Sequence, residues 1–279
     1  MRLLLAVFVI CLLLTGWGCT KSSSSSIAKQ KLYRVEFPQA DYPLGHSDIY
    51  GYDAQGRLSS IISYVGSVVG NRDSFYYDSF GRLSSFVSST DGQPFIQRHL
   101  FTYATSNEIK STETRAVRIE AQGSMGGPFE TYSASDIFYD DANRTQTFAL
   151  YYPGGKTYGR TVLTRDNEGN ITNATYIYTD TIQGIDLPIW SADYTYDAGR
   201  TPFEGMSSLI FYRCIDGYEN FQYTQPHNVL TRYATAFTSN SVSPVTTSFK
   251  YEFNGLGYPV TKTIDDGTSN VVIETYEYR

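Results

Sequence analysis

The sequence predicts an all-β protein: a large curved antiparallel β-meander of about 16 strands, either an open shell or barrel-like, built from hairpin repeats. Three observations lead to this fold class. Aromatic residues make up 15% of the 279 residues, with 25 Tyr and 16 Phe, a composition that favours β-sheets. Charged residues make up only 18%, which excludes a coiled coil. The third observation is an internal repeat with a period of roughly 29 residues.

The first element along the chain is a targeting segment, residues 1–18. Arg2 precedes an apolar run of 12 residues, Leu3 to Leu14, which is shorter than the about 20 residues of a membrane-spanning helix. Small residues follow the run and lead to Cys19. The segment is similar to a bacterial lipoprotein signal peptide, with Cys19 as the lipidated first residue of the mature protein. A plain secretory signal peptide is the alternative.

A lipoprotein signal implies a location in the bacterial cell envelope, as an outer-membrane lipoprotein that faces the periplasm or the cell surface. The membrane is then a partner through the lipid anchor. The net charge of −6 at pH 7 and the pI near 5.1 exclude nucleic acid as a partner. Because an anionic membrane repels a negatively charged protein, attachment depends on the acyl chains.

The second element, residues 19–31, is a tether that follows the lipidated cysteine. It contains five consecutive serines, Ser22 to Ser26, a composition that behaves as a flexible linker. The third element is a single β-repeat domain, residues 32–279. Cys214 is the one cysteine of this domain, so we expect no intramolecular disulfide.

Two segments of this domain show the repeat most clearly: GYDAQGRLSS at residues 51–60 and YYDSFGRLSS at residues 76–85, which lie 25 residues apart. An early Asp or Asn can accept a hydrogen bond from the backbone two residues on, and a following glycine can adopt a left-handed conformation. This pattern is typical of a hairpin turn. Weaker copies begin near residues 103, 139, 165, 196, 223 and 253. We therefore expect structural turn glycines at Gly56, Gly81, Gly169 and Gly199.

An apolar residue stands two positions before Tyr52 and Tyr77, and likewise two positions before the start of each weaker copy at residues 103, 139, 165, 196, 223 and 253. Since side chains alternate along a strand, these residues would form an aromatic stripe on one face of the sheet. Each repeat has room for two strands, so eight repeats give about 16 strands, and a twisted sheet of that size curls or closes. The residues of the stripe are Tyr50, Phe75, Phe101, Ile137, Leu163, Tyr194, Phe221 and Tyr251.

The two clearest turns, Tyr52-Asp53-x-x-Gly56-Arg57-Leu58 and Tyr77-Asp78-x-x-Gly81-Arg82-Leu83, resemble the YD repeats of RHS-type β-shell proteins. The lipidated array as a whole is similar to uncharacterised bacterial lipoproteins with a porin-like β fold. The resemblance covers residues 32–279. It implies a curved antiparallel shell and no established reaction, and no functional residue is carried over.

The sequence contains no G-x-S-x-G motif, and His46, His99 and His227 are scattered along it. No His or Cys pair has the spacing of a zinc site, and the acidic segments lack the spacing of an EF-hand. We expect no metal, no cofactor and no enzymatic activity. One catalytic alternative stays open, a carboxylate-based glycan hydrolase of the envelope, because such chemistry needs only two acids roughly 5 to 10 Å apart.

Topology predicts where a ligand would bind. If the repeated turns share one edge of the sheet, the other connections share the opposite edge, and these vary in length and composition. We expect a non-catalytic binding or structural shell, with a glycan or an envelope protein as possible partner. The aromatic residues of this variable edge have an alternative role, which is to cover the ends of the sheet and not to bind a ligand. The candidate ligand-binding residues are Phe129, Tyr151, Tyr152, Trp190 and Tyr218.

A transmembrane barrel is the rival architecture, because porins also have 16 strands. Three features oppose it: the lipoprotein-type signal, the charged last residue Arg279, and strands such as residues 171–178 that lack a clean apolar face. We therefore expect a protein that begins near Ser26 to be soluble without detergent.

Overall fold

The structure is a computed structural model, and it describes residues 29–38, 45–104, 114–140, 144–151, 157–180, 182–206, 225–238, 241–265, 267 and 270–279. The chain divides into two units, Met1–Lys31 and Leu32–Arg279, and the second unit holds all the described strands. No described segment forms a helix that is long and apolar enough to cross a membrane. The targeting segment, with Cys19, lies outside the described residues.

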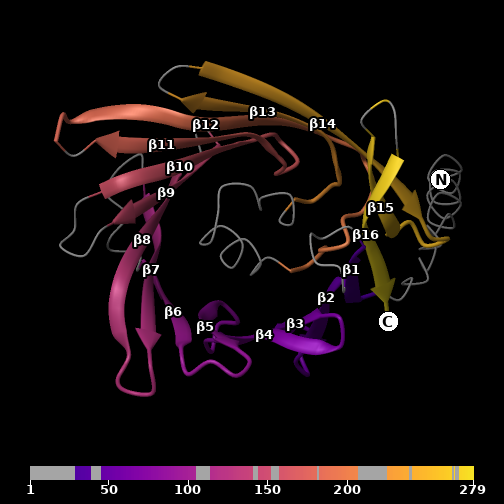
Figure 1. Cartoon of the computed structure of the whole chain (residues 1–279), viewed down its shortest axis with the longest axis horizontal. Helices are drawn as coiled ribbons and strands as arrows, with labels where there is room; N and C mark the ends of the chain where they lie inside the picture. Colours follow the sequence, from indigo (N-terminus) through magenta and orange to yellow (C-terminus); the bar gives the residue numbers. More distant parts are fainter. Residues whose placement is uncertain are drawn as a thin grey trace, which may run out of the picture. The chain divides into compact units, whose positions relative to one another are not determined.

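Residues 32–279 form a closed antiparallel β-barrel in which each strand pairs with the next and the last pairs with the first (Figure 1). The predicted all-β meander of 16 strands is thus confirmed, and the sheet closes. The strands are β1 (Leu32–Phe37), β2 (His46–Tyr52), β3 (Leu58–Val65), β4 (Val68–Tyr77), β5 (Leu83–Thr90), β6 (Ile96–Tyr103), β7 (Thr114–Ser124), β8 (Glu130–Asp140), β9 (Thr145–Tyr151), β10 (Thr157–Arg165), β11 (Ile171–Asp180), β12 (Ile185–Tyr196), β13 (Val229–Thr238), β14 (Ser241–Phe253), β15 (Pro259–Asp265) and β16 (Asn270–Tyr278).

Four of the repeated turns share one set of hydrogen bonds. The N–H of Asp53 donates to the carbonyl of Arg57, and the N–H of Gly56 donates to the carbonyl of Asp53, both at 2.9 Å. Oδ1 of Asp53 accepts the backbone N–H groups of Gln55 and Arg57 at 3.0 and 2.8 Å. The same four bonds recur in the turns that begin at Asp78, Asp166 and Asn254.

Arginine side chains hold the first two turn carboxylates in place. Nε of Arg57 donates to Oδ2 of Asp53 at 2.7 Å, and Nε of Arg82 donates to Oδ2 of Asp78 at 2.8 Å. Desolvation alone would raise the pKa of both carboxyl groups, but the hydrogen bonds from the arginine backbone and side chain lower it below the usual value.

Two different physical reasons favour glycine at the four predicted turn positions. Gly56, Gly81 and Gly169 have φ angles of 80°, 78° and 89°, which lie in the left-handed region. Gly199 is not among the described glycines with positive φ. A Cβ at Gly199 would instead lie 3.0 to 3.1 Å from atoms of Asn228, Asp197 and Phe253, so close packing requires glycine there.

The repeated turns lie at one end of the barrel, the signature end, and the remaining connections lie at the opposite, variable end. This follows from strict alternation of strand direction around the ring. Two expected turns, at residues 196–200 and 223–228, are the two ends of a single connection, because β12 pairs directly with β13. Much of this connection, with Cys214, Tyr218 and Phe221, lies outside the described residues.

A β-bulge recurs at the second residue of most odd-numbered strands. In β3, Gly51 pairs with Ser60 and Tyr52 pairs with Leu58, so Ser59 is the extra residue. The bulge lets Leu58 and Ile61, three residues apart, face the same side, and their exposed fractions are 2% and 0%. The other bulged residues are Tyr33, Ser84, Thr172, Leu230 and Val260.

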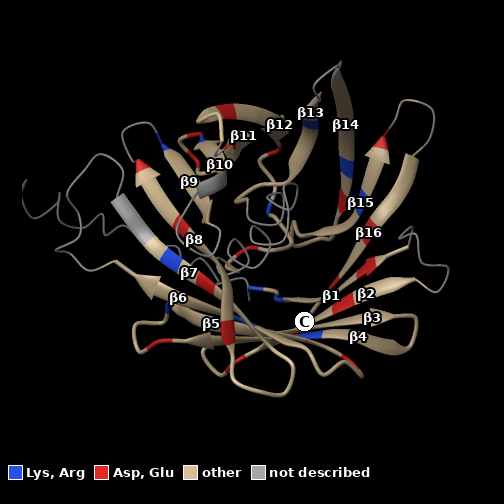
Figure 2. Ribbon diagram, turned by 60° about the vertical axis from the view of Figure 1, so that its left-hand side comes forward, with Lys and Arg blue, Asp and Glu red and all other residues tan. Residues whose placement is uncertain are grey.

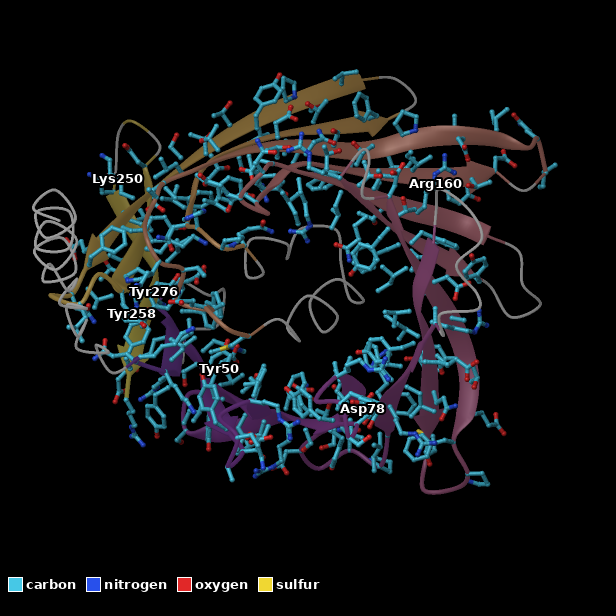
Figure 3. All side chains as sticks on the ribbon, turned by 180° about the vertical axis from the view of Figure 1, so that it is seen from behind. Tyr50, Asp78, Arg160, Lys250, Tyr258 and Tyr276 are labelled. Carbon is cyan, nitrogen blue, oxygen red and sulfur yellow. The ribbon has the colours of Figure 1, made fainter. Side chains whose placement is uncertain are left out.

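The inner wall of the barrel carries the core. Residues 197–206, which follow β12, contribute to this core, because the Phe203 ring lies 6.2 Å from the ring of Tyr50 and 6.4 Å from the ring of Tyr276. Both tyrosines lie on the inner side of their strands in Figure 3. The described residues of the predicted stripe therefore face inward. All of them are buried except Tyr251, which is half-buried.

The outer wall is polar and charged at mid-height. Arg118 alternates with the inward Ile119, and its Nη1 lies 3.2 Å from Oδ1 of Asp136 on the neighbouring strand. Nζ of Lys250 lies 2.7 Å from Oδ2 of Asp265 in the same way. Figure 2 shows charged residues on strands around the ring.

Candidate binding site

Of the five aromatic residues predicted for ligand binding, the three that the structure describes do not form one cluster. Phe129 lies at the variable end, where the Arg98 guanidinium stacks over its ring at 4.1 Å. Tyr151 ends β9 at the same end of the barrel. Trp190 lies within β12 on the inner wall and is only 8% exposed.

Two of the five, Tyr152 and Tyr218, lie outside the described residues. Tyr218 belongs to the connection between β12 and β13, which begins and ends at the signature end. The role predicted for Tyr218 therefore stays a prediction.

A different set of side chains gathers at the mouth of the barrel, on the inner wall near the variable end. One row of cross-strand partners runs from β8 to β12: Ser135, Leu150, Gly159, Tyr178 and Leu187. Tyr178 is 37% exposed and Leu187 is 40% exposed. These two side chains lie on the inner wall of a closed barrel and still reach solvent.

A buried row lies directly beneath this exposed row. Ile137, Phe148, Thr161, Tyr176 and Trp190 are successive partners across the same five strands, and each is 8% exposed or less. The interior therefore changes from a packed core to a solvent-exposed wall between one inward row and the next.

Glycine at position 159 makes room for an aromatic ring. A Cβ there would lie 2.6 Å from the hydroxyl oxygen of Tyr176, so the tyrosine lies across the glycine backbone. This contact fixes the ring of Tyr176 between the buried row and the exposed row.

Gly123 of β7 also makes room for aromatic rings. A Cβ there would lie 2.8 Å from Cε2 of Phe95 and 3.6 Å from Cε1 of Tyr132. Tyr132 is the bulged residue of β8, and its hydroxyl accepts a hydrogen bond from Nε2 of Gln97 at 2.6 Å. Phe95 and Tyr132 are each 40% exposed. We call the exposed inward residues Phe95, Tyr132, Tyr178, Ile185 and Leu187 the mouth arc.

Acidic residues stand above both halves of the mouth arc. Glu130 pairs with Gly123 and Asp180 pairs with Ile185, so both occupy inward positions at the ends of their strands. Oδ1 of Asp180 accepts the N–H groups of Ile182 and Gln183 at 2.8 and 3.0 Å, which fixes its carboxylate at the rim. The described variable-end turns contain no Lys or Arg.

The inner-wall acids nearer the core are buried and hydrogen bonded. Asp48 is 3% exposed and accepts a bond from Oγ of Ser63 at 2.6 Å. Glu274 is also 3% exposed, and its Oε1 lies 2.9 Å from Nζ of Lys262, while Tyr276 donates to its Oε2 at 2.7 Å. These contacts give Asp48 and Glu274 a structural role in the inner wall.

The three histidines are separated in the fold as they are in sequence. His99 is 2% exposed, stacks on Phe86 with ring centroids 4.3 Å apart, and burial lowers its pKa to about 4. His46 contacts Asp48, whereas Nδ1 of His227 lies 3.1 Å from Oδ1 of Asn170 at the signature end. No group of three metal-ligating side chains occurs among the described residues.

One cavity of about 470 Å³ opens at the signature end. Its described lining comes from the connection between β12 and β13, residues 198–206 and 225–227. The described charges there are engaged: Nη1 of Arg200 lies 2.7 Å from the hydroxyl of Tyr258 and 3.8 Å from Oε2 of Glu204.

Comparisons with known proteins give similarities of architecture only. No family model matches the chain, and no curated protein matches it. Crystal structures of porin-like proteins from Bacteroides vulgatus and Bacteroides uniformis are similar at 10% and 12% identity, with TM-scores of 0.49 and 0.48. The matches cover 90% and 89% of this chain and 99% and 96% of those chains. The resemblance to YD-repeat families stays a prediction.

Proposed function

We propose that this protein is a lipid-anchored, non-catalytic β-barrel of the bacterial cell envelope that stands in water and binds a ligand, a glycan or a protein, at its variable end. The observation that carries the proposal is the polarity of the barrel. The inner wall buries the apolar core, and the charged groups Asp48, Lys262 and Glu274 within it are hydrogen bonded or paired, whereas the outer wall carries charges that reach solvent. The mouth of a β-barrel is a common place for a ligand site, and the mouth arc offers exposed apolar side chains there.

The distribution of charge opposes immersion of the strands in lipid. A transmembrane barrel carries an apolar band outside and polar residues inside. Here Arg118 and Lys250 lie at outward positions within their strands, and such residues cost about 2 to 4 kcal/mol each at the bilayer midplane. Phe86 and Ile119 lie inward and are 1% and 2% exposed.

Solubility tests this part of the proposal. A chain that begins at Ser26 contains all sixteen strands, and we expect it to be monodisperse without detergent and to give no channels in planar bilayers. Recovery only in detergent, or steady conductance after addition to a bilayer, would contradict the proposal.

The lipid anchor is tested separately through Cys19. We expect Cys19→Ala to move the protein from the membrane fraction to the soluble fraction, because the charged outer wall offers no apolar band to hold it in a membrane. Cys214→Ala is the matched control, and it should leave the protein in the membrane fraction. Retention of the Cys19→Ala protein would show that another contact holds it.

A further inference from the structure

We propose that the ligand of the mouth arc is a basic, amphipathic polypeptide segment, which places apolar side chains on the inner wall and positive charges at the acidic rim. This inference rests on the mouth as the binding site proposed above, and it chooses between a glycan and a protein.

The composition of the mouth arc favours apolar side chains over sugar rings. Ile185 and Leu187 are aliphatic, and they are 44% and 40% exposed. Aliphatic groups gain from burying other apolar groups, whereas a sugar also needs several polar partners for its hydroxyl groups. The side chains of the arc offer a sugar only two polar groups, the hydroxyls of Tyr132 and Tyr178, and that of Tyr132 already accepts a bond from Gln97.

The charges at the rim favour a positively charged ligand. Glu130 and Asp180 lie at inward positions directly above the two halves of the arc, and Asp91 adds a third carboxylate in the exposed turn between β5 and β6. The described turns of this end hold no basic residue, and Arg98, which stacks over Phe129 there, comes from an outward position of β6. The whole chain carries a net charge of −6. Lysine and arginine would also find the faces of Tyr132 and Tyr178 within reach of the carboxylates.

The closed sheet decides how a peptide is recognised. Every described strand has hydrogen-bonded neighbours on both sides, so no free edge can accept a peptide as an additional strand. Recognition must then come from side chains of the inner wall, which restricts the ligand to a narrow segment that enters the mouth. A flexible segment or a loop of an envelope protein has this form.

Peptide titration tests the proposal, with the chain that begins at Ser26 and a short fluorescent peptide of alternating Lys and Leu. We expect saturable binding that weakens as salt rises. The same peptide with Glu in place of Lys, or with Ser in place of Leu, should bind at least tenfold more weakly. A neutral β-linked oligosaccharide is the competing probe, and we expect it neither to bind nor to displace the peptide.

Two pairs of substitutions locate the site. The double variant Tyr178→Ala/Leu187→Ala should bind the basic peptide roughly tenfold or more weakly, because both apolar contacts are lost. The double variant Glu130→Gln/Asp180→Asn should bind the peptide roughly three- to tenfold more weakly, and its affinity should depend less on the salt concentration. The Asp180→Asn substitution keeps a side-chain oxygen that can accept the hydrogen bonds from the backbone N–H groups of Ile182 and Gln183.

Matched outer-wall variants are the controls. Tyr233→Ala removes a 46% exposed tyrosine from the outer face of β13, and Asp193→Asn removes an outward carboxylate from β12. Both should leave binding unchanged. Equal losses in these controls, no binding of the basic peptide, or displacement by the oligosaccharide would overturn the proposal. The solubility and conductance experiments use no peptide, so failure of the proposed function is recognised independently.

Discussion

The hydroxyl of Tyr77 donates a hydrogen bond of 2.7 Å to the carbonyl oxygen of Leu58, and so joins the end of β4 to the start of β3 at the signature end. Arg57, in the turn before β3, stacks over the ring of Tyr77 at 4.3 Å. The same arrangement recurs one hairpin later between Tyr103 and Leu83, at 2.8 Å. A tyrosine thus ties an even strand to the odd strand before it in five hairpins of the barrel, those that end with β2, β4, β6, β12 and β16. Equivalent bonds join Tyr52 to Leu32, Tyr196 to Ile171 and Tyr278 to Pro259.

Removal of one such hydroxyl should lower stability. We expect Tyr77→Phe and Tyr103→Phe each to cost about 1 kcal/mol, the net value of a hydrogen bond, and to lower Tm by about 2 to 4 °C. Thermal and urea unfolding measure the loss. Tyr76→Phe is the control, because Tyr76 is 52% exposed on the outer wall and should be neutral. An equal loss at Tyr76 would show that the tyrosine-to-carbonyl bonds add nothing.

Substitution of the turn glycines should separate backbone strain from steric contact. At Gly56 and Gly81, Val should cost more than about 1 kcal/mol because a β-branched residue disfavours positive φ, whereas Asn tolerates that conformation and should be milder. At Gly199 we expect Asn to be as harmful as Val, because the obstacle there is contact with Asn228 and Phe253. Unfolding of the six single variants measures the pattern. An Asn advantage at Gly199, or none at Gly56 and Gly81, would contradict these assignments.

Acid should destabilise the protein through His99. Burial lowers the pKa of His99 from 6.5 to about 4, so between these values the unfolded chain takes up a proton that the folded barrel does not. Stability is therefore complete above pH 6.5 and falls as the pH drops toward 4, by about 3 kcal/mol in total. His99→Phe should remove this part of the pH dependence and keep the stacking on Phe86. Parallel stability curves for the two proteins across this range would show that His99 does not titrate in this way.

The buried pair Lys262 and Glu274 should behave as a unit. Lys262→Met alone or Glu274→Leu alone leaves one buried charge without its partner and should cost about 3 to 5 kcal/mol. The double variant should cost much less than the sum of the two. A double-mutant cycle by urea unfolding gives the coupling free energy. The exposed pair Lys250 and Asp265 is the control, with an expected coupling below about 1 kcal/mol.

The fold was predictable where the hydrogen bonds of a side chain and the backbone preference of a neighbouring residue both indicate the same turn. Asp53 with Gly56 and Asp78 with Gly81 mark hairpin turns because only a few residue types can satisfy those turns. The count of 16 strands is correct although two of the eight expected turns belong to one connection. Seven connections at the signature end join β2 to β15, and the pair of β1 with β16 completes the ring. The strand bulges were not predictable, because the polar Ser59 and Ser60 between Leu58 and Ile61 fit both a plain and a bulged strand.

The mouth arc was harder to predict, because its members come from one turn and three strands, β8, β11 and β12, whose register depends on tertiary pairing. Tyr178 and Leu187 become neighbours only through the bulge between β11 and β12. Trp190, which the sequence favoured for binding, lies one inward row deeper and is buried. A signal did exist in the isolated Gly123 and Gly159, since a glycine within a strand often marks the close approach of another group.

The short strand that closes the ring also determines how the barrel would bear mechanical load. β1 has six residues, and it is paired along one side with β16 and along the other with β2. A pull that is applied at Leu32 along the axis of β1 acts perpendicular to the interstrand hydrogen bonds. Such a force shears the bonds on both sides together and does not break them one at a time. Along its own axis, β1 therefore resists load through its pairing with both β2 and β16.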